Sequence, residues 1–274
     1  MSQRRVPRLL VVVAHPDDET FGCGSVLLHA AARGAVTAVC CATRGEAGEP
    51  APGSGVTVER LAAVRDAELR AAARALGVSR VVLLDHRDSA MDGEPASGAL
   101  VAAPLQAVAA DITGVIDDLR PHVVVTLDAA DGHRDHAHVR DATLLAVTRS
   151  SWPVPRVYLQ CLARSLLRRW ADHMATVQPD SPYLDVDGLG LGTPDEQITT
   201  VIDSTAHLPA RLAVISEHRS QTSPFAALPD DVSHDFLAVD RLRRVLPPWP
   251  GGAVEHEMLP DSRRVNGGDG EAPP

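Results

Sequence analysis

The chain has 274 residues, of which 45% are hydrophobic and 23% charged, with a formal net charge of −10 at pH 7. This composition is typical of a soluble globular protein, and the negative charge argues against a nucleic-acid or anionic-membrane surface. The 26 basic residues are all arginine. The absence of lysine excludes a P-loop with its lysine, Schiff-base chemistry and pyridoxal-phosphate enzymes, all of which need an amine.

The longest apolar runs are about half the length that a membrane-spanning helix needs. The first of these runs leads directly into a polar motif, so we interpret it as part of the fold and not as a removable signal peptide. We therefore expect the protein in the cytoplasm. The four cysteines (Cys23, Cys40, Cys41 and Cys161) have no metal-ligand spacing. We expect small buried hydrophobic side chains there and no disulfide framework.

The first predicted strand, residues 9–13, is an uninterrupted run of Leu and Val, as in strands buried on both faces of a parallel sheet. It is followed by Ala14-His15-Pro16-Asp17-Asp18-Glu19. Burying these polar groups is costly unless they are paired or hold a metal. The simpler alternative is a strand-to-helix turn with an Asp as helix cap, but a cap needs only one carboxylate.

A helix over 25–33 and a strand over 36–43 are predicted next. The intervening Gly22-Cys23-Gly24 lacks the third glycine of a dinucleotide-binding fingerprint, so a nicotinamide-dependent oxidoreductase is a weak alternative. A polar loop over 44–55 follows the second strand and can overhang a site at its carboxyl end. In the next helix, 57–76, Arg65 and Glu68 are three residues apart, which by spacing alone is compatible with a surface ion pair.

A third strand over 81–84 leads into Asp85-His86-Arg87-Asp88, and a helix over 105–119 precedes a fourth strand over 122–127. A second polar cluster, residues 128–138, follows that strand. The βαβα alternation predicts a doubly wound, mostly parallel α/β sheet with strand order 3-2-1-4-5. Strands one and four are then neighbours, so the two polar clusters should meet at their carboxyl ends.

The rest of the chain is less informative. We expect a fifth strand over 157–161, a helix ending near residue 176, a loop over 178–194, an edge strand over 197–202 and a helix over 208–221. With no internal repeat and no second core, we predict a single domain over residues 1–260. A Gly-, Pro- and acid-rich tail over 261–274 is predicted to be disordered.

Two imidazoles and one carboxylate at the meeting point would leave a coordination position open for water, as in catalytic zinc sites. Zinc lowers the pKa of bound water and polarises a carbonyl, and a nearby free carboxylate can accept the proton. Spacing alone leaves open whether Asp17 or Asp18 binds the metal. It also does not distinguish His133, His136 and His138.

The motifs together resemble the LmbE/PIG-L family of zinc-dependent N-acetylglucosamine deacetylases, whose members include the mycothiol-pathway deacetylase and the mycothiol-conjugate amidase. Besides the hexapeptide, the resemblance includes the second strand's Thr43-Arg44-Gly45-Glu46-Ala47-Gly48 loop and an R-x-x-E helix at Arg65. His133-Arg134-Asp135-His136 and His218-Arg219-Ser220-Gln221 complete it, so that it covers residues 8–221. It implies the Rossmann-like LmbE fold.

The resemblance also implies residue roles. His15, Asp18 and His136 would bind Zn²⁺, although Fe²⁺ could use the same ligands. Asp17 would be the general base for a zinc-bound water, and His133 would stabilise the tetrahedral intermediate or protonate the leaving amine. Asp135 would orient an imidazole from behind the ligands. Arg65, Asp88 and His218 would contact the substrate, and His138 has no family role.

One departure concerns the substrate, because several relatives carry Tyr where this chain has Asp131. An ionised carboxylate cannot donate the hydrogen bond that a tyrosine gives the oxyanion. A milder departure is Arg134 in place of a common Pro. The predicted function is hydrolysis of the N-acetyl group of a small amino-sugar substrate. Alternatives are an amidase for a larger N-acyl group of a thiol conjugate or glycosylated metabolite, and a catalytically silent metal- or sugar-binding module. The oligomeric state is not readable from the sequence.

Overall fold

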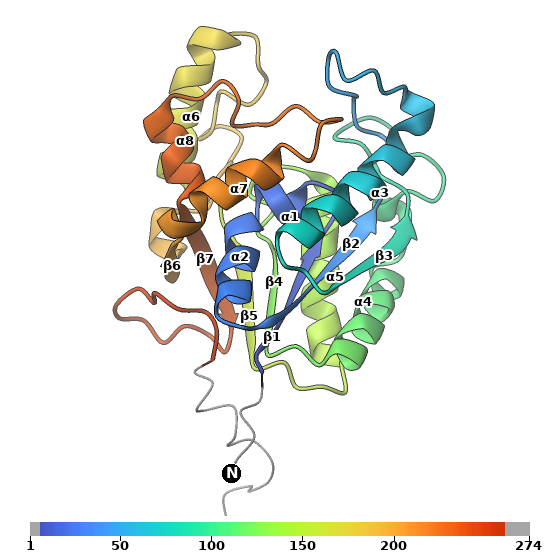
Figure 1. Cartoon of the computed structure of the whole chain (residues 1–274), viewed down its shortest axis with the longest axis vertical. Helices are drawn as coiled ribbons and strands as arrows, with labels where there is room; N and C mark the ends of the chain where they lie inside the picture. Colours follow the sequence, from blue (N-terminus) through green and yellow to red (C-terminus); the bar gives the residue numbers. More distant parts are fainter. Residues whose placement is uncertain (1–5, 261–274) are drawn as a thin grey trace, which may run out of the picture.

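The computed structural model describes residues 6–260, and within them seven strands form one sheet with the order β3-β2-β1-β4-β5-β7-β6 (Figure 1). The strands are β1 (Arg8–Val13), β2 (Val36–Thr43), β3 (Arg80–His86), β4 (Val123–Leu127), β5 (Arg156–Gln160), β6 (Thr200–Asp203) and β7 (Val239–Leu246). Neighbours among β1–β5 are parallel. The predicted α/β class, the order 3-2-1-4-5 and the edge position of β6 are thereby confirmed.

Helices cover both faces of this sheet: α2, α3 and α7 lie on one face, and α4 and α5 on the other (Figure 1). The helices are α1 (Asp18–Phe21), α2 (Gly24–Ala32), α3 (Val58–Ala75), α4 (Leu105–Leu119), α5 (Arg134–Arg149), α6 (Arg164–Val177), α7 (Leu208–Ile215) and α8 (Asp230–Leu237), with short 3₁₀ turns η1 (Leu100–Ala102), η2 (Asp195–Gln197) and η3 (Thr205–His207). Helix α6 packs against α8, which contacts β7 near the β6 end of the sheet.

The alternation of side chains along β1 explains the two cores. Leu9, Val11 and Val13 belong to the cluster that includes α2 and α3, whereas Leu10 and Val12 belong to the cluster that includes α4 and α5. All five side chains are at most 1% exposed. The unbroken apolar run of β1 therefore follows from its position at the centre of the sheet, buried on both faces.

The C-terminal third differs most from the sequence prediction. Helix α8 and strand β7 were not predicted, and the helix predicted over 208–221 ends at Ile215, so that His218–Gln221 lies in a turn. Strand β7 runs antiparallel between β5 and β6. Charged side chains occupy four of its eight positions, which hides the apolar pattern of a strand. Strand β7 is therefore stabilised by its hydrogen bonds to β5 and β6, which the sequence pattern does not show.

All four cysteines are free and buried, which confirms the expectation for them. Between residues 6 and 260, no helix is both long and apolar enough to cross a membrane. The tail predicted over 261–274 lies outside the described residues, and the domain boundary at residue 260 stays a prediction.

Candidate metal and catalytic site

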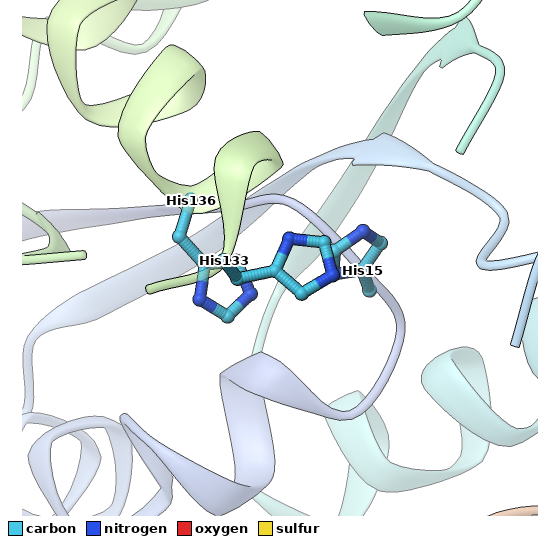
Figure 2. Close-up of side chains that lie close together, drawn as sticks. All are labelled: His15, His133 and His136. Carbon is cyan, nitrogen blue, oxygen red and sulfur yellow. The ribbon is translucent and has the colours of Figure 1, made fainter. Parts of the chain in front are cut away.

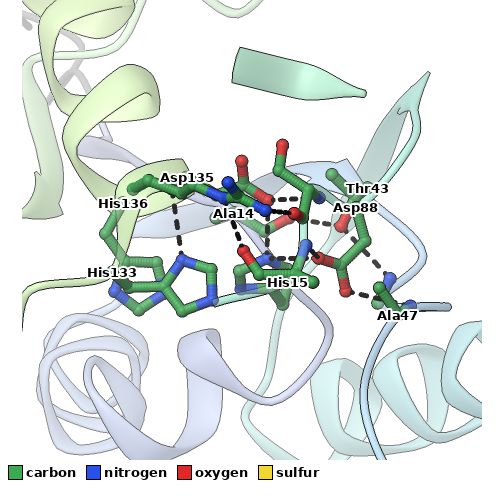
Figure 3. Close-up of polar contacts among 12 residues, drawn as sticks. Ala14, His15, Thr43, Ala47, Asp88, His133, Asp135 and His136 are labelled. Carbon is green, nitrogen blue, oxygen red and sulfur yellow. Dashed lines mark hydrogen bonds and ion pairs between the residues drawn. The ribbon is translucent and has the colours of Figure 1, made fainter. Parts of the chain in front are cut away.

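The two polar segments meet at the carboxyl ends of β1 and β4, as predicted. His15 follows β1, and Asp135 lies in the first turn of α5, which begins shortly after β4. His15 Nε2 and Asp135 Oδ2 are 3.1 Å apart, and both side chains are buried (Figure 3). These two residues are 120 positions apart in the sequence, so the fold brings distant segments into contact here.

Three imidazoles come together at this point (Figure 2). The ring centroids of His15 and His133 are 4.7 Å apart, those of His133 and His136 are 4.6 Å apart, and those of His15 and His136 are 5.3 Å apart. One ring nitrogen from each lies within 4.8 Å of the others, a spacing at which they could hold a metal ion. A second group that meets this criterion consists of His15, Asp88 and Asp135.

The carboxylate of Asp18 lies between two of these imidazoles. Its Oδ2 is 3.5 Å from His15 Nδ1, and its Oδ1 is 3.3 Å from His136 Nε2. The backbone N–H of His15 also donates to Asp18 Oδ2, at 2.8 Å. The three ligands that the resemblance implies are therefore adjacent. His138, the third histidine left open by spacing, belongs to neither metal-capable group.

Further carboxylates contact the imidazoles on their other sides. Asp131 Oδ2 is 2.5 Å from His136 Nδ1, and Asp131 Oδ1 accepts a hydrogen bond from the backbone N–H of His133 at 3.0 Å. Asp135 Oδ2 accepts a hydrogen bond from the backbone N–H of Ser89 in addition to contacting His15. The carboxylate of Asp131 thus faces the ring of His136.

The surroundings favour the charged form of His15 and His136 and the neutral form of His133. Burial lowers the pKa of His136, but Asp18 and Asp131 outweigh it and raise that pKa to about 10. Burial acts in the same direction on His15, where hydrogen bonds with Asp135, Asp18 and Asp88 raise the pKa well above its ordinary value. For His133, burial and the neighbouring imidazoles lower the pKa to about 4.

A divalent cation fits this donor set. His136 Nε2 is buried and has no hydrogen-bond partner, although it points toward Asp18. When the Nδ1–H of His136 donates to Asp131, the Nε2 lone pair faces a carboxylate, and a cation between them removes the repulsion. His15, Asp18 and His136 supply the nitrogen and oxygen ligands that zinc and iron(II) accept.

Asp17 is held apart from the imidazoles. Its backbone has φ 121°, a strained value for a non-glycine residue, and its side chain makes no cap hydrogen bond to α1. The helix-cap alternative is thereby wrong for Asp17. Its Oδ2 instead pairs with Arg65 Nη2 at 3.0 Å. Burial raises the pKa of Asp17 to about 6, against the lowering effect of Arg65.

Arg65 is a buried residue of α3, only 4% exposed, and the surface ion pair with Glu68 is wrong. Arg65 Nη1 donates to the carbonyl of Gly45, and Nη2 donates to the carbonyl of Pro16. A Cβ at Gly45 would lie 2.3 Å from the Arg65 guanidinium, and Gly45 has φ +65°. The glycine therefore lets the 44–55 loop pass over the arginine.

Glu68 and Glu19 also have partners that sequence reasoning missed. Glu68 accepts hydrogen bonds from the backbone N–H and the hydroxyl of Ser220. Glu19 lies 2.9 Å from His218 Nε2, with both side chains 0% exposed. The structure thus places His218 behind Glu19. The H-x-S-Q motif marked residues 218–221 as part of the family pattern. It did not indicate that His218 contacts Glu19 or that Ser220 contacts Glu68.

Asp88 contacts His15, and Arg134 holds the loop that follows Asp88. Asp88 Oδ1 is 3.6 Å from His15 Nε2, and Asp88 Oδ2 accepts a hydrogen bond from the backbone N–H of Ala47 (Figure 3). Burial opposes ionisation of Asp88, but His15 and the surrounding groups lower its pKa to about 2. Arg134 donates to the carbonyls of Ala90, Asp92 and Gly93, so it fixes the loop that follows Asp88.

Comparison with known sequences gives a consistent family match. The family model described as PIG-L, GlcNAc-PI de-N-acetylase, matches residues 10–147. A 1D-myo-inositol 2-acetamido-2-deoxy-alpha-D-glucopyranoside deacetylase from Mycolicibacterium vanbaalenii is 39% identical in an alignment of 230 residues that covers 79% of this chain and 81% of that protein.

Solved structures show the same fold at lower identity. The N,N'-diacetylchitobiose deacetylase from Pyrococcus horikoshii has a TM-score of 0.54 and 20% identity, covering 88% of this chain and 84% of that one. GalB, the 4-carboxy-2-hydroxymuconate hydratase from Pseudomonas putida KT2440, has a TM-score of 0.60 and 18% identity, covering 90% and 100%. Because one neighbour is a hydratase, the fold alone does not determine the reaction.

Proposed function

Because this chain belongs to the PIG-L family of de-N-acetylases and is therefore a hydrolase of amide C–N bonds, we propose that it removes the N-acetyl group from a small N-acetylglucosamine-containing molecule with the aid of a divalent cation. The observation that carries the proposal is the position of Asp18 between His15 Nδ1 and His136 Nε2, with the unpaired Nε2 directed at it. Asp17, a second carboxylate, lies beside this set without joining it.

His15, Asp18 and His136 would hold Zn²⁺, or Fe²⁺ in the same ligand set. The bound cation supplies a lowered pKa for water and polarisation of the amide carbonyl. Asp131 and Asp135 hold the two imidazoles from behind, which fixes the ring orientation and the tautomer. These two carboxylates are positioning residues in the proposal.

Asp17 acts as the general base. Its carboxylate accepts a proton from the attacking water, and Arg65 holds it in place through the 3.0 Å ion pair. The water oxygen bonds to the carbonyl carbon, the C–N bond breaks, and the amine leaves with a proton from Asp17 or His133. His133 lies next to both metal-binding imidazoles, in position to stabilise the oxyanion.

The substrate class follows from the relatives, of which the one from M. vanbaalenii is named for an inositol-linked 2-acetamido sugar. Arg65, Asp88 and His218 stay predicted substrate contacts, although Arg65 and His218 are already paired with Asp17 and Glu19. We keep the cytoplasm as the expected location, and we expect neither nucleic acid nor membrane as a partner.

The test is primary-amine release from a panel of N-acetylglucosamine derivatives, including an inositol-linked one. Metal-stripped protein, protein restored with Zn²⁺ and protein restored with Fe²⁺ are compared. We expect release only after metal is restored. Equal release from stripped protein would contradict the metal, and a protein that binds metal but releases no amine from any sugar would contradict the substrate class.

A further inference from the structure

Two apolar cavities adjoin the catalytic centre. One, of about 270 Å³, is lined by the side chains of Asp18 and His136 and by apolar residues, among them Phe21, Leu162, Leu167, Trp170, Phe225 and Phe236. The other, of about 280 Å³, is lined by His133 and includes Met91, Tyr183 and Leu191. Asp131, Leu162, Leu167 and Trp170 line both, so the cavities are neighbours across a common wall.

The aromatic residues of the chain are concentrated at these cavities. Aromatic residues make up only 3% of the sequence, yet all three Phe, one of three Trp and one of two Tyr line them. The rings of Phe21 and Phe225 meet edge to face at 6.1 Å, and those of Phe225 and Phe236 are 6.0 Å apart. These rings come from α1, from α8 and from the segment between α7 and α8.

Other polar side chains lie outside both cavities, near His15, whose Nε2 is 3.6 Å from Asp88 Oδ1. Arg65 comes from α3, and Glu46 and Asp88 follow β2 and β3. Only a few polar side chains, including those of Asp131 and Gln160, join the metal-binding pair in the first cavity. Sugar hydroxyls need hydrogen-bond partners, whereas an apolar chain is favoured by apolar surroundings without water. The aromatic side chains that line the first cavity, which we call the aromatic wall, provide such surroundings. An amide at the centre therefore places its sugar toward β2 and β3 and its acyl group toward the aromatic wall.

A methyl group is similar in size to a water molecule, which takes up about 30 Å³ in the liquid. The first cavity, of about 270 Å³, is therefore much larger than an acetyl methyl group needs. We propose that this cavity, which we call the acyl subsite, binds the apolar acyl chain of N-acyl amino sugars, and that the enzyme prefers chains of several carbons to acetyl. The inference rests on the proposed function and uses the same hydrolysis. The water oxygen bonds to the carbonyl carbon, the C–N bond breaks, and a fatty-acid carboxylate and a protonated amine form.

The test measures kcat/KM for amine release from methyl N-acyl-glucosaminides with acetyl, butanoyl, hexanoyl and octanoyl groups, using the metal-loaded protein. Burial of a methylene is worth about 0.8 kcal/mol, so we expect kcat/KM to rise about fourfold per methylene until the subsite is full. A parallel arm uses octyl N-acetylglucosaminide, in which the apolar chain is on the aglycone.

Two variants address the wall of the subsite. Phe225→Asp introduces a charge, and Leu162→Trp fills space. Each should lower the ratio of octanoyl to acetyl kcat/KM by about four- to sixteenfold, the cost of one or two lost methylene burials. Leu212→Asp, at an exposed apolar residue of α7, is the matched control and should leave the ratio unchanged. Leu162→Trp adds no charge, so it covers the case in which Phe225→Asp fails to fold.

The outcomes separate the two proposals. Acetyl release without a gain for longer chains overturns the acyl subsite and leaves the proposed function standing. A gain confined to the octyl glycoside also overturns it, because the cavity then binds an aglycone. Metal-loaded protein that releases amine from no member of the series overturns the proposed function together with the inference.

Discussion

Asp131 Oδ2 lies 2.5 Å from His136 Nδ1, so this carboxylate holds the imidazole that we propose as a metal ligand. The sequence suggested that Asp131 alters the handling of the oxyanion. The structure instead ties it to the ring of His136 and to the backbone N–H of His133. Its side chain is about one-third exposed, so substitution should be tolerated by the fold.

We expect Asp131→Ala to weaken metal binding about 10–100-fold, the usual cost of losing a carboxylate behind a metal-binding histidine. Asp131→Asn, whose amide oxygen can still accept from Nδ1–H, should lose less. Competition with a chelator measures the affinity. Asp141→Asn on the exposed side of α5 is the control, and an unchanged affinity in Asp131→Ala would refute the role.

Asp17→Asn should lower kcat about 10²–10⁴-fold while the protein keeps its metal, because the asparagine cannot accept the proton of water. Asp18→Asn should instead lose the metal. Both activity and bound metal per chain are measured. A near-wild-type rate in Asp17→Asn would show that another group is the base.

The buried pair of Glu19 and His218 predicts a pH-dependent stability. Burial lowers the pKa of His218, but the hydrogen bond and charge of Glu19 outweigh it, and the net pKa is raised. A raised pKa in the folded state means that the pair's stabilisation is complete below the unfolded pKa of about 6.5 and disappears as the pH rises through the folded pKa.

Glu19→Gln should therefore lower the free energy of unfolding by about 2 kcal/mol at pH 6, and the deficit should shrink toward pH 9. Urea unfolding at a series of pH values, in the presence of chelator, measures it. Glu196→Gln, at an exposed position, should show no such trend. A deficit that stays constant or grows with pH would mean that His218 is not charged in the folded protein.

The cysteines should be unreactive in the native state. Burial raises the pKa of Cys40 and Cys161 to about 12, and all four thiols are buried. We expect a thiol reagent at pH 8 to label none of them in the folded protein and all four in denaturant. Rapid labelling of one native thiol would show that its surroundings open.

The site was predictable from the sequence wherever it depends on strand order. Once β1 and β4 are neighbours, His15 must lie close to the polar cluster over 128–138, because both follow the same end of the sheet. Strand order alone did not distinguish His136 from His133 and His138. The pairing of Arg65 with Asp17 was not predictable, since it depends on how α3 packs and on the path of the Gly45 loop.

The aromatic wall was missed for a similar reason. Phe21, Trp170 and Phe225 are far apart in the sequence and carry no common spacing, and an overall aromatic content of 3% gave no sign of a platform. They line one cavity because α6 and the segment between α7 and α8 lie close to α1 in the fold. Composition averages over the chain and is insensitive to such local enrichment.

The insertion of β7 between β5 and β6 has a consequence for synthesis of the chain. Residues 156–160 leave the ribosome long before residues 239–246, which supply their antiparallel neighbour and the Arg243 that binds Asp128 at 2.7 Å. Until then one edge of the nascent parallel sheet is unpaired, with Val157 and Leu159 in its last strand. Chains interrupted before Val239 should therefore self-associate through this edge.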